Sequence, residues 1–239
     1  MFRPLAAWMT RRIAALPDPG AVCRICARWP SRTFCDDCLR RFARPVARCP
    51  RCALPLPAGQ PGCGACLRRP PPLAACVAAL PYGFPWDRSI AALKFQGDAG
   101  LAGALARLLA AAPGAEALLA SAHRLVPMPL STPRLRERGF NQAALLAGPL
   151  APRRCDGASL LRIRHTAALS GLDRAARQAQ VRGAFAVEPG RAGRIAGQRI
   201  LLVDDVMTSG ATLHEAARVL LAAGAATVSA LVLARTGFD

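Results

Sequence analysis

The stretch that most constrains the fold comprises residues 201–212 and reads LLVDDVMTSGAT. A run of apolar residues ends in two adjacent carboxylates, Asp204 and Asp205, and a short loop of threonine, serine and glycine follows. Beyond the loop, leucine and alanine recur at helical spacing. The stretch therefore predicts a buried strand, an acidic pair, a short loop and a helix.

This order of elements suits a sugar phosphate. Backbone N–H groups and hydroxyls of the loop can point at a phosphate, and the positive end of the helix dipole favours its charge. Two neighbouring carboxylates can accept hydrogen bonds from two vicinal hydroxyls. We therefore predict a ribose 5-phosphate site; the structural alternative is a buried strand that ends in an Asp-capped turn. The predicted phosphate loop consists of Met207, Thr208, Ser209, Gly210, Ala211 and Thr212.

Strand-like and helix-like segments alternate through the C-terminal two thirds of the chain. This alternation favours an α/β fold with a mostly parallel sheet and helices on both faces. Ligands in such sheets bind at the carboxyl ends of strands, and the acidic pair is expected at such an end. The expected strands are 73–81, 124–128, 158–163, 199–203 and 227–234, with a short edge strand at 183–187, and the expected helices are 86–95, 100–111, 140–149 and 211–223.

Eight of the ten cysteines form four C-x-x-C pairs that repeat in two similar halves. Two such turns can place four thiolates around one metal and leave no coordination position open, which predicts two structural Zn²⁺ sites. Disulfides and an iron–sulfur cluster are the alternatives. The spacing leaves open whether the two quartets are sequential or interleaved. The predicted ligands are Cys23, Cys26, Cys35, Cys38, Cys49, Cys52, Cys63 and Cys66.

Three consecutive prolines at 70–72 form a stiff boundary after the last cysteine pair. We expect a basic N-terminal leader over residues 1–20, a double zinc-ribbon module over 21–69 and an α/β domain over 73–239. Arginines interrupt the apolar residues of the leader, which is unlike a signal peptide. The longest apolar stretch, 101–122, also contains charged residues and a proline, so no membrane span and a cytoplasmic location are expected.

The formal net charge of +18 is concentrated in two blocks, +10 over residues 1–72 and +8 over residues 120–182. The second block carries Arg134, Arg136 and Arg138 in a proline-rich stretch after an expected strand. Guanidinium groups chelate phosphate oxygens, so these arginines are candidates for binding a diphosphate. The alternative is a solvated basic loop. The basic blocks could also hold single-stranded DNA through its phosphates.

The twelve-residue motif resembles the phosphoribosyl diphosphate (PRPP) motif of type I phosphoribosyltransferases. The cysteine pairs are followed by LKFQGD at residues 93–98, by RGFNQ at 138–142 and by the motif itself. In this order the chain resembles, over nearly its whole length, the ComF-type competence proteins, to which GntX is similar. One region departs from the family pattern: Leu169 replaces a Gln and Gln180 replaces an Asn.

The resemblance implies a zinc-ribbon module on a type I phosphoribosyltransferase fold that binds PRPP with Mg²⁺. In that family Asp204 and Asp205 would be the catalytic pair that holds the ribose 2- and 3-hydroxyls, and residues 207–212 would wrap the 5-phosphate. It also implies a link to DNA uptake in natural transformation, with single-stranded DNA and a competence helicase as partners. Some purine-type members carry an acid where Thr208 stands, and a threonine cannot take a proton near neutral pH.

Three functions are compatible with the sequence. The first is a phosphoribosyltransferase that transfers a pentosyl group to an acceptor that is already anionic or is activated elsewhere. The second is a single-stranded-DNA-binding competence protein, and the third is a regulator that senses PRPP without turnover.

Overall fold

The computed structural model describes residues 21–165 and 174–237. The expected leader over residues 1–20 lies outside this part of the chain, as does Leu169.

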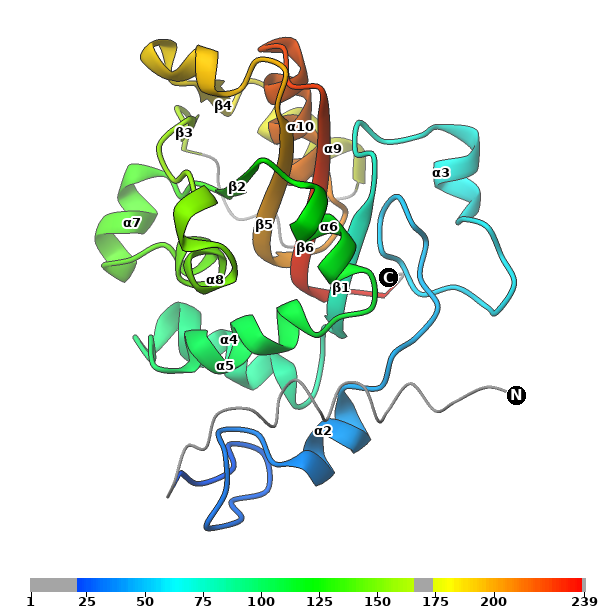
Figure 1. The fold of residues 1–239 in the computed structure, drawn as a ribbon, viewed down its shortest axis with the longest axis vertical. Helices are drawn as coiled ribbons and strands as arrows, with labels where there is room; N and C mark the ends of the chain where they lie inside the picture. The colour runs from blue at the N-terminus through cyan, green and yellow to red at the C-terminus, as the bar shows by residue number, and fades with distance from the viewer. Residues whose placement is uncertain (1–20, 166–173, 238–239) are drawn as a thin grey trace.

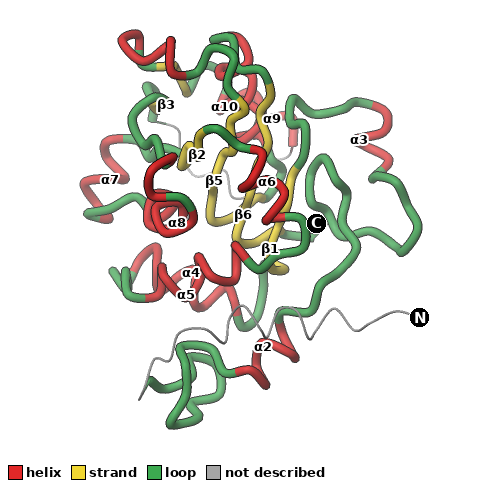
Figure 2. The backbone as a smooth tube through the Cα atoms, in the orientation of Figure 1, coloured by secondary structure: helices red, strands yellow, loops and turns green. Residues whose placement is uncertain are grey.

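Four parallel strands form the central sheet (Figures 1 and 2). In spatial order they are β1 (Cys76–Pro81), β6 (Thr227–Arg235), β5 (Arg199–Met207) and β2 (Arg124–Pro127). Each neighbouring pair is parallel. The expected mostly parallel sheet is therefore confirmed. A separate antiparallel pair joins β3 (Leu160–Arg162) to β4 (Phe185–Val187).

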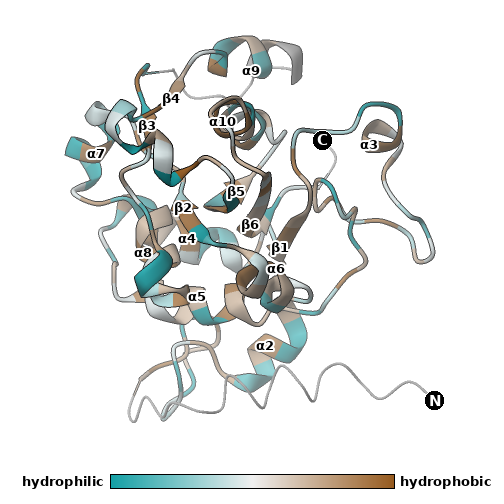
Figure 3. Ribbon diagram, turned by 45° about the horizontal axis from the view of Figure 1, so that its top comes forward, coloured by the Kyte–Doolittle hydropathy of each residue, from teal (hydrophilic) through white to brown (hydrophobic). Residues whose placement is uncertain are grey.

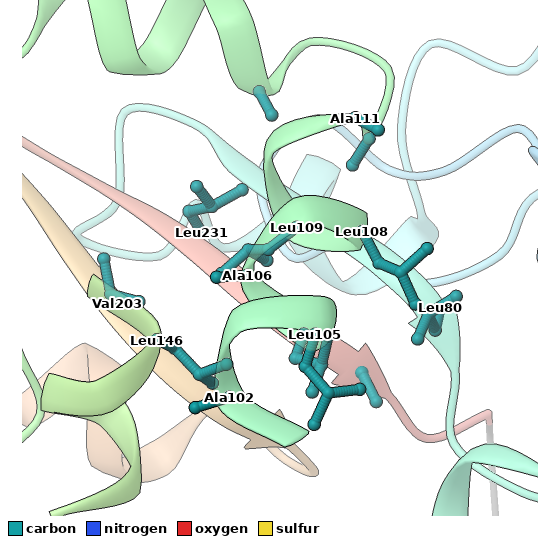
Figure 4. Close-up of a cluster of buried hydrophobic side chains, with 14 of the residues drawn as sticks. Leu80, Ala102, Leu105, Ala106, Leu108, Leu109, Ala111, Leu146, Val203 and Leu231 are labelled. Atoms are coloured by element: carbon teal, nitrogen blue, oxygen red, sulfur yellow. The ribbon is translucent and has the colours of Figure 1, made fainter. Parts of the chain in front are cut away.

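Alternate residues of β5 and β6 point to opposite faces of the sheet, and each face is covered by its own apolar cluster. Leu201 and Leu231 pack with the helices of one face, whereas Leu202 and Val232 pack with α10 on the other. Figure 4 shows the first cluster, where leucines and alanines of α5 meet the sheet. The helices of the first face are α4 (Trp86–Phe95), α5 (Leu101–Ala110), α6 (Ala115–Ser121) and α8 (Gln142–Leu150); α10 (Ala211–Ala222) and α9 (Arg174–Val181) contact each other beyond the second.

The cysteine-rich region packs against both faces of the α/β region. Helix α2 (Asp36–Phe42) follows Cys35, and Phe34 meets Trp86 of α4 edge to face at 5.2 Å. Helix α3 (Gly64–Arg68) follows Cys63, and the second group of cysteines belongs to the apolar cluster under β1 and β6. Figure 3 shows the exposed turns of this region as more hydrophilic than the strands beside them.

The structure contains several elements that the sequence did not predict, among them helices α2 and α3 of the cysteine-rich region. Helices α6, α9 and α7 (Thr132–Arg138) were not expected, and two short 3₁₀ turns, Pro152–Arg154 and Pro189–Arg194, complete the connections. Strand β5 continues to Met207 instead of ending at residue 203, because β6 keeps pairing with it.

Among the described residues no single helix is long and apolar enough to cross a membrane. Helices α5 and α6 together satisfy length and composition, but a 92° bend separates them.

Candidate sugar-phosphate site and cysteine groups

The acidic pair lies just beyond the point where strand β2 ends beside β5. Strand β2 pairs with β5 only as far as Val203, whereas β6 continues past it. Asp204 and Asp205 are thus the first residues of β5 that lack a strand neighbour on the β2 side. The Asp204 carboxylate accepts a hydrogen bond from the Asp205 N–H at 2.9 Å, and Asp205 accepts one from the Val206 N–H at 2.7 Å. Asp205 is buried and Asp204 is partly exposed.

A lysine from a distant helix neutralises one member of the pair. Lys94, in the last turn of α4, places its Nζ 2.8 Å from Oδ2 of Asp205. Burial and then the charge of Asp205 raise the pKa of Asp204 to about 8, while Lys94 opposes that rise. The Asp204 carboxyl, beside the charged Asp205, therefore keeps its proton more readily than an ordinary carboxyl until a cation approaches.

The predicted phosphate loop is shaped by Gly210, which has a φ of +80°. A β-carbon at this position would lie 2.4 Å from Cε of Met207 and 2.9 Å from Nε2 of His214, so the backbone approaches both side chains closely. Helix α10 begins directly after Gly210, which has no side chain to cap it. The Ser209 hydroxyl accepts from the Ala211 N–H at 3.4 Å. Helix N-termini of this kind are suited to binding a phosphate.

The three predicted arginines occupy helix α7 rather than a loop. Residues four apart share a helix face, so Arg134 and Arg138 lie together and are partly buried, whereas Arg136 points the other way and is exposed. Arg162 at the end of β3 lies close enough to Arg134 and Asp204 for both charges to act on its pKa, which burial lowers most. The structure thus places Arg134 near Arg162, which in turn lies near Asp204, whereas Arg136 is on the exposed side of α7.

The RGFNQ segment forms the connection between α7 and α8. Gly139, with a φ of +77°, ends α7, and the Asn141 side chain accepts from the N–H groups at the start of α8. Arg138 stacks over the ring of Phe95, 5.0 Å from its centroid. Arg138 Nε and Gln142 Oε1 are buried and make no hydrogen bond within the described residues. Gln180, in the region that departs from the family pattern, has the same property at Oε1.

Sequence reasoning missed two groups at this site. Lys94 lies in the segment 93–98, which is part of the family resemblance. It is also the only lysine in the chain, and these two features could have identified it. Arg162 had no signal beyond its position at the end of an expected strand. The Ser131 hydroxyl and Nδ1 of His165, 2.9 Å apart, link the start of α7 to the residues after β3.

The eight predicted metal ligands form two sequential groups, which settles the question of interleaving. Within each group all four sulfurs lie within 4.8 Å of one another. Cys26 and Cys35 in the first group, and Cys52 and Cys63 in the second, have sulfurs 3.6 Å apart. This distance is close to the roughly 3.8 Å between sulfurs around a tetrahedral zinc and far from the length of a disulfide bond. Both groups are compatible with a structural zinc ion.

Backbone N–H groups prepare one sulfur of each group for a metal. Burial opposes ionisation of Cys23, but the backbone N–H groups of Cys26, Cys35 and Ile25 lower the pKa of its thiol to about 6. In the second group the corresponding bonds lower the pKa of Cys49 to about 7. Zinc binds thiolates, so these sulfurs suit the ion.

Comparison with known proteins agrees with this architecture. Residues 146–237 match the phosphoribosyl transferase domain family. The chain is 37% identical over 235 residues to the DNA utilization protein YhgH of Salmonella typhi, covering 92% of this chain and 99% of that protein. It is 31% identical over 209 residues to Competence protein F of Haemophilus influenzae, covering 84% of this chain and 90% of that protein. It is 38% identical over 115 residues to Competence protein ComFC of Bacillus subtilis, covering 47% of this chain and 44% of that protein.

These matches extend over both the cysteine groups and the region that carries the acidic pair and phosphate loop. The chain therefore belongs to the ComF family, in which a region with two four-cysteine groups is joined to a phosphoribosyltransferase-type domain.

Proposed function

We propose that the chain binds PRPP, with Mg²⁺, at the carboxyl end of β5 and transfers its ribose 5-phosphate group to an acceptor. The observation that carries the proposal is the adjacency of two features. Asp204 and Asp205 lie at the point where β2 has ended, and the glycine loop before α10 follows within the same motif. The match to the phosphoribosyl transferase domain family covers this segment and supports a ribose-phosphate ligand.

Each part of the ligand has a matching part of the chain. The two carboxylates are suited to the ribose 2- and 3-hydroxyls, and residues 207–212 to the 5-phosphate. Arg134 and Arg138 are suited to the diphosphate, because their shared face is partly buried and Arg138 Nε makes no hydrogen bond within the described residues. Arg136, on the exposed face of α7, is assigned no role in this proposal.

The site also fits Mg²⁺. Carboxylate and phosphate oxygens are the ligands that this ion prefers, and Asp204 and Asp205 supply negative charge beside the proposed ribose. When bound with PRPP, the ion would neutralise charge on the diphosphate. Lys94 already pairs with Asp205 at 2.8 Å, so Asp204 is the carboxylate more open to the incoming ligand.

In the proposed transfer the acceptor forms a bond to C1 of the ribose as the C1–O bond to diphosphate breaks, and the electron pair leaves with the diphosphate. The chain contributes positioning and charge stabilisation. Thr208 in the phosphate loop is exposed and cannot accept a proton near neutral pH, so the acceptor would be anionic already or be activated by another group.

The relatives named for DNA utilization and competence favour a cellular role linked to DNA uptake. The charge of +18 supports contact with a polyanion such as single-stranded DNA, alone or beside a competence helicase. DNA binding at physiological salt that weakens steeply with added salt would support this second role, and salt-insensitive or absent binding would contradict it.

A thermal-shift titration with PRPP, with and without Mg²⁺, tests the proposed site. A ligand at 100 times its Kd stabilises by about 2.7 kcal/mol, or roughly 5–10 °C for a chain of this size. We expect a Mg²⁺-dependent shift that Asp204→Asn combined with Asp205→Asn abolishes.

The matched control is the exposed acidic pair of α2, Asp36→Asn combined with Asp37→Asn, which makes the same chemical change elsewhere. This variant should keep the shift. Absence of a shift in the wild-type protein at millimolar PRPP would refute the proposed ligand. Transfer itself is tested by diphosphate release in an acceptor screen.

A further inference from the structure

Arg235, the last residue of β6, is a buried cation that donates hydrogen bonds to three backbone carbonyls and to the hydroxyl of Thr236. Only 7% of the residue is exposed. Its Nε donates to the Cys52 carbonyl at 3.0 Å, and its Nη1 donates to the carbonyls of Met207 at 3.2 Å and Thr236 at 2.9 Å. Its planar fork therefore spans two segments that are far apart in the sequence.

The two distant partners belong to different functional parts. Cys52 is a ligand of the second cysteine group, and Met207 is the residue from which the phosphate loop departs. The Thr236 N–H also donates to the Met207 carbonyl, at 3.2 Å. The end of β5 is thus fixed to the cysteine group through a single guanidinium.

Met207 also contacts the phosphate loop through its side chain. Its Cε lies 2.4 Å from where a β-carbon of Gly210 would stand, so the side chain supports the turn directly. Its sulfur accepts from the Cys76 thiol at 3.7 Å, and the Cys76 N–H donates to the carbonyl of Pro50 between the cysteines of the same group. Two routes therefore join the second group to the base of the phosphate loop.

The positive charge of Arg235 also favours a link to the second cysteine group. Within the described residues Arg235 forms no ion pair with a carboxylate, and a buried unpaired charge is costly. Four thiolates on one Zn²⁺ carry a net charge of −2, and the second group lies directly behind the Cys52 carbonyl. A zinc-bound second group would therefore supply the counter-charge that keeps the guanidinium in place.

Among the residues that the structure describes, no such direct contact joins the phosphate loop to the first group. Its cysteines form a small cluster of their own, and its links to the rest of the chain run to α4 and the loop after it, from Phe34 to Trp86 and from Arg24 to Asp98. It packs on the opposite face of the sheet from α10.

We propose that Arg235 is a positioning residue that holds the phosphate loop against the second cysteine group, so that metal binding at that group sets the order of the loop and its affinity for a phosphate. The inference rests on the proposed function only for the identity of the ligand. The ordering of the loop can be measured without any ligand.

Hydrogen–deuterium exchange of the ligand-free protein tests the proposal at the amides of residues 208–213. Arg235→Gln and Cys52→Ser should each speed exchange there at least tenfold. Cys26→Ser in the first group is the matched control and should leave these amides unchanged. Arg235→Lys keeps the buried positive charge but lacks the forked guanidinium. Compared with Arg235→Gln, it should therefore have a higher melting temperature, while the amides of residues 208–213 should still exchange fast.

Two results would overturn the proposal: unchanged exchange in the Arg235 variants, or an equal effect of Cys26→Ser. The dissociation constant for ribose 5-phosphate gives a second reading, with at least a tenfold increase expected for Arg235→Lys and none for Cys26→Ser. If the wild-type protein binds neither ribose 5-phosphate nor PRPP, the proposed function fails, and the exchange data alone still decide the role of Arg235.

Discussion

Lys94 and Asp205 form an ion pair, with Nζ and Oδ2 2.8 Å apart, that ties the end of α4 to the acidic pair of β5. The same short segment makes two further contacts. Phe95 lies under the guanidinium of Arg138, and Asp98 pairs with Arg24 beside the first cysteine group. Residues 94–98 thus connect α7, β5 and the first cysteine group, which gives the LKFQGD segment a structural role.

Replacing Lys94 by Met should destabilise the protein. The side chain of Asp205 is only 5% exposed and that of Lys94 is 19% exposed, so the change leaves a buried carboxylate without its counter-ion. Losing one partner of a buried pair costs about 3 kcal/mol of unfolding free energy, measured by chemical denaturation. A double-mutant cycle with Asp205→Asn separates the free energy of the ion pair from the loss of packing around Lys94. A coupling free energy near zero would contradict the importance of the ion pair.

Asp204 should make stability fall as pH rises from about 4 to about 8. Its pKa is about 8 in the folded protein against an ordinary value of 3.8, so in this range the folded state holds a proton that the unfolded state has lost. The contribution is fully present below pH 4 and lost above pH 8. Asp204→Asn cannot titrate, so the wild type should lose stability relative to this variant as pH rises. A constant difference across this range would contradict the raised pKa.

The fold was predictable because its signals are local. Apolar runs marked the strands, and the leucine spacing of 101–110 marked a helix. Helix α7 was missed because Pro133 and alternating arginines are typical of a loop, yet a proline in the first helical turn lacks only an N–H that would be unpaired there. Helix α6 was missed because its start, after a proline and Gly114 with a φ of +85°, contains no capping side chain.

The site was predictable only in part, for a physical reason. The motif strand, acidic pair and loop are contiguous, so the sequence displays them together. The contacts of Lys94 and Arg162 with this motif depend on how α4 and β3 pack beside β5, and no local pattern encodes that packing. The end of β5 was misjudged because its last residues are held by β6 rather than by their own apolar character.

Cys26→Ser should reduce the zinc content from two ions to one. Cys26 is the exposed cysteine of the first group, and a site with three thiolates would hold the ion less tightly. The second group should keep its metal because its four cysteines are all buried and belong to the apolar cluster under β1 and β6, apart from the first group. Metal analysis of the purified variant measures this, and a retained stoichiometry of two with an unchanged melting temperature would argue against structural zinc in the first group.

Gly210→Ala should impair both folding and phosphate binding. The β-carbon would meet Met207 and His214, and alanine is strained at a φ of +80°, so we expect a loss of about 1–3 kcal/mol. Gly148→Ala in α8 is the control, because a β-carbon there meets nothing within 4 Å and alanine favours a helix by up to about 1 kcal/mol. Equal denaturation midpoints for the two variants would contradict the close approach at Gly210.

Arg134 and Arg136 provide a test of which face of α7 meets the ligand. Arg134 is partly buried on the face it shares with Arg138, and its charge reaches Arg162 beside Asp204, whereas Arg136 is exposed on the other side. Arg134→Gln should weaken PRPP binding about tenfold or more and affect ribose 5-phosphate little, because only PRPP carries the diphosphate that a guanidinium would chelate. Arg136→Gln should change neither affinity. Calorimetric titration of both ligands into both variants measures the difference, and equal losses from the two substitutions would mean that α7 acts through its overall charge and not through one oriented face.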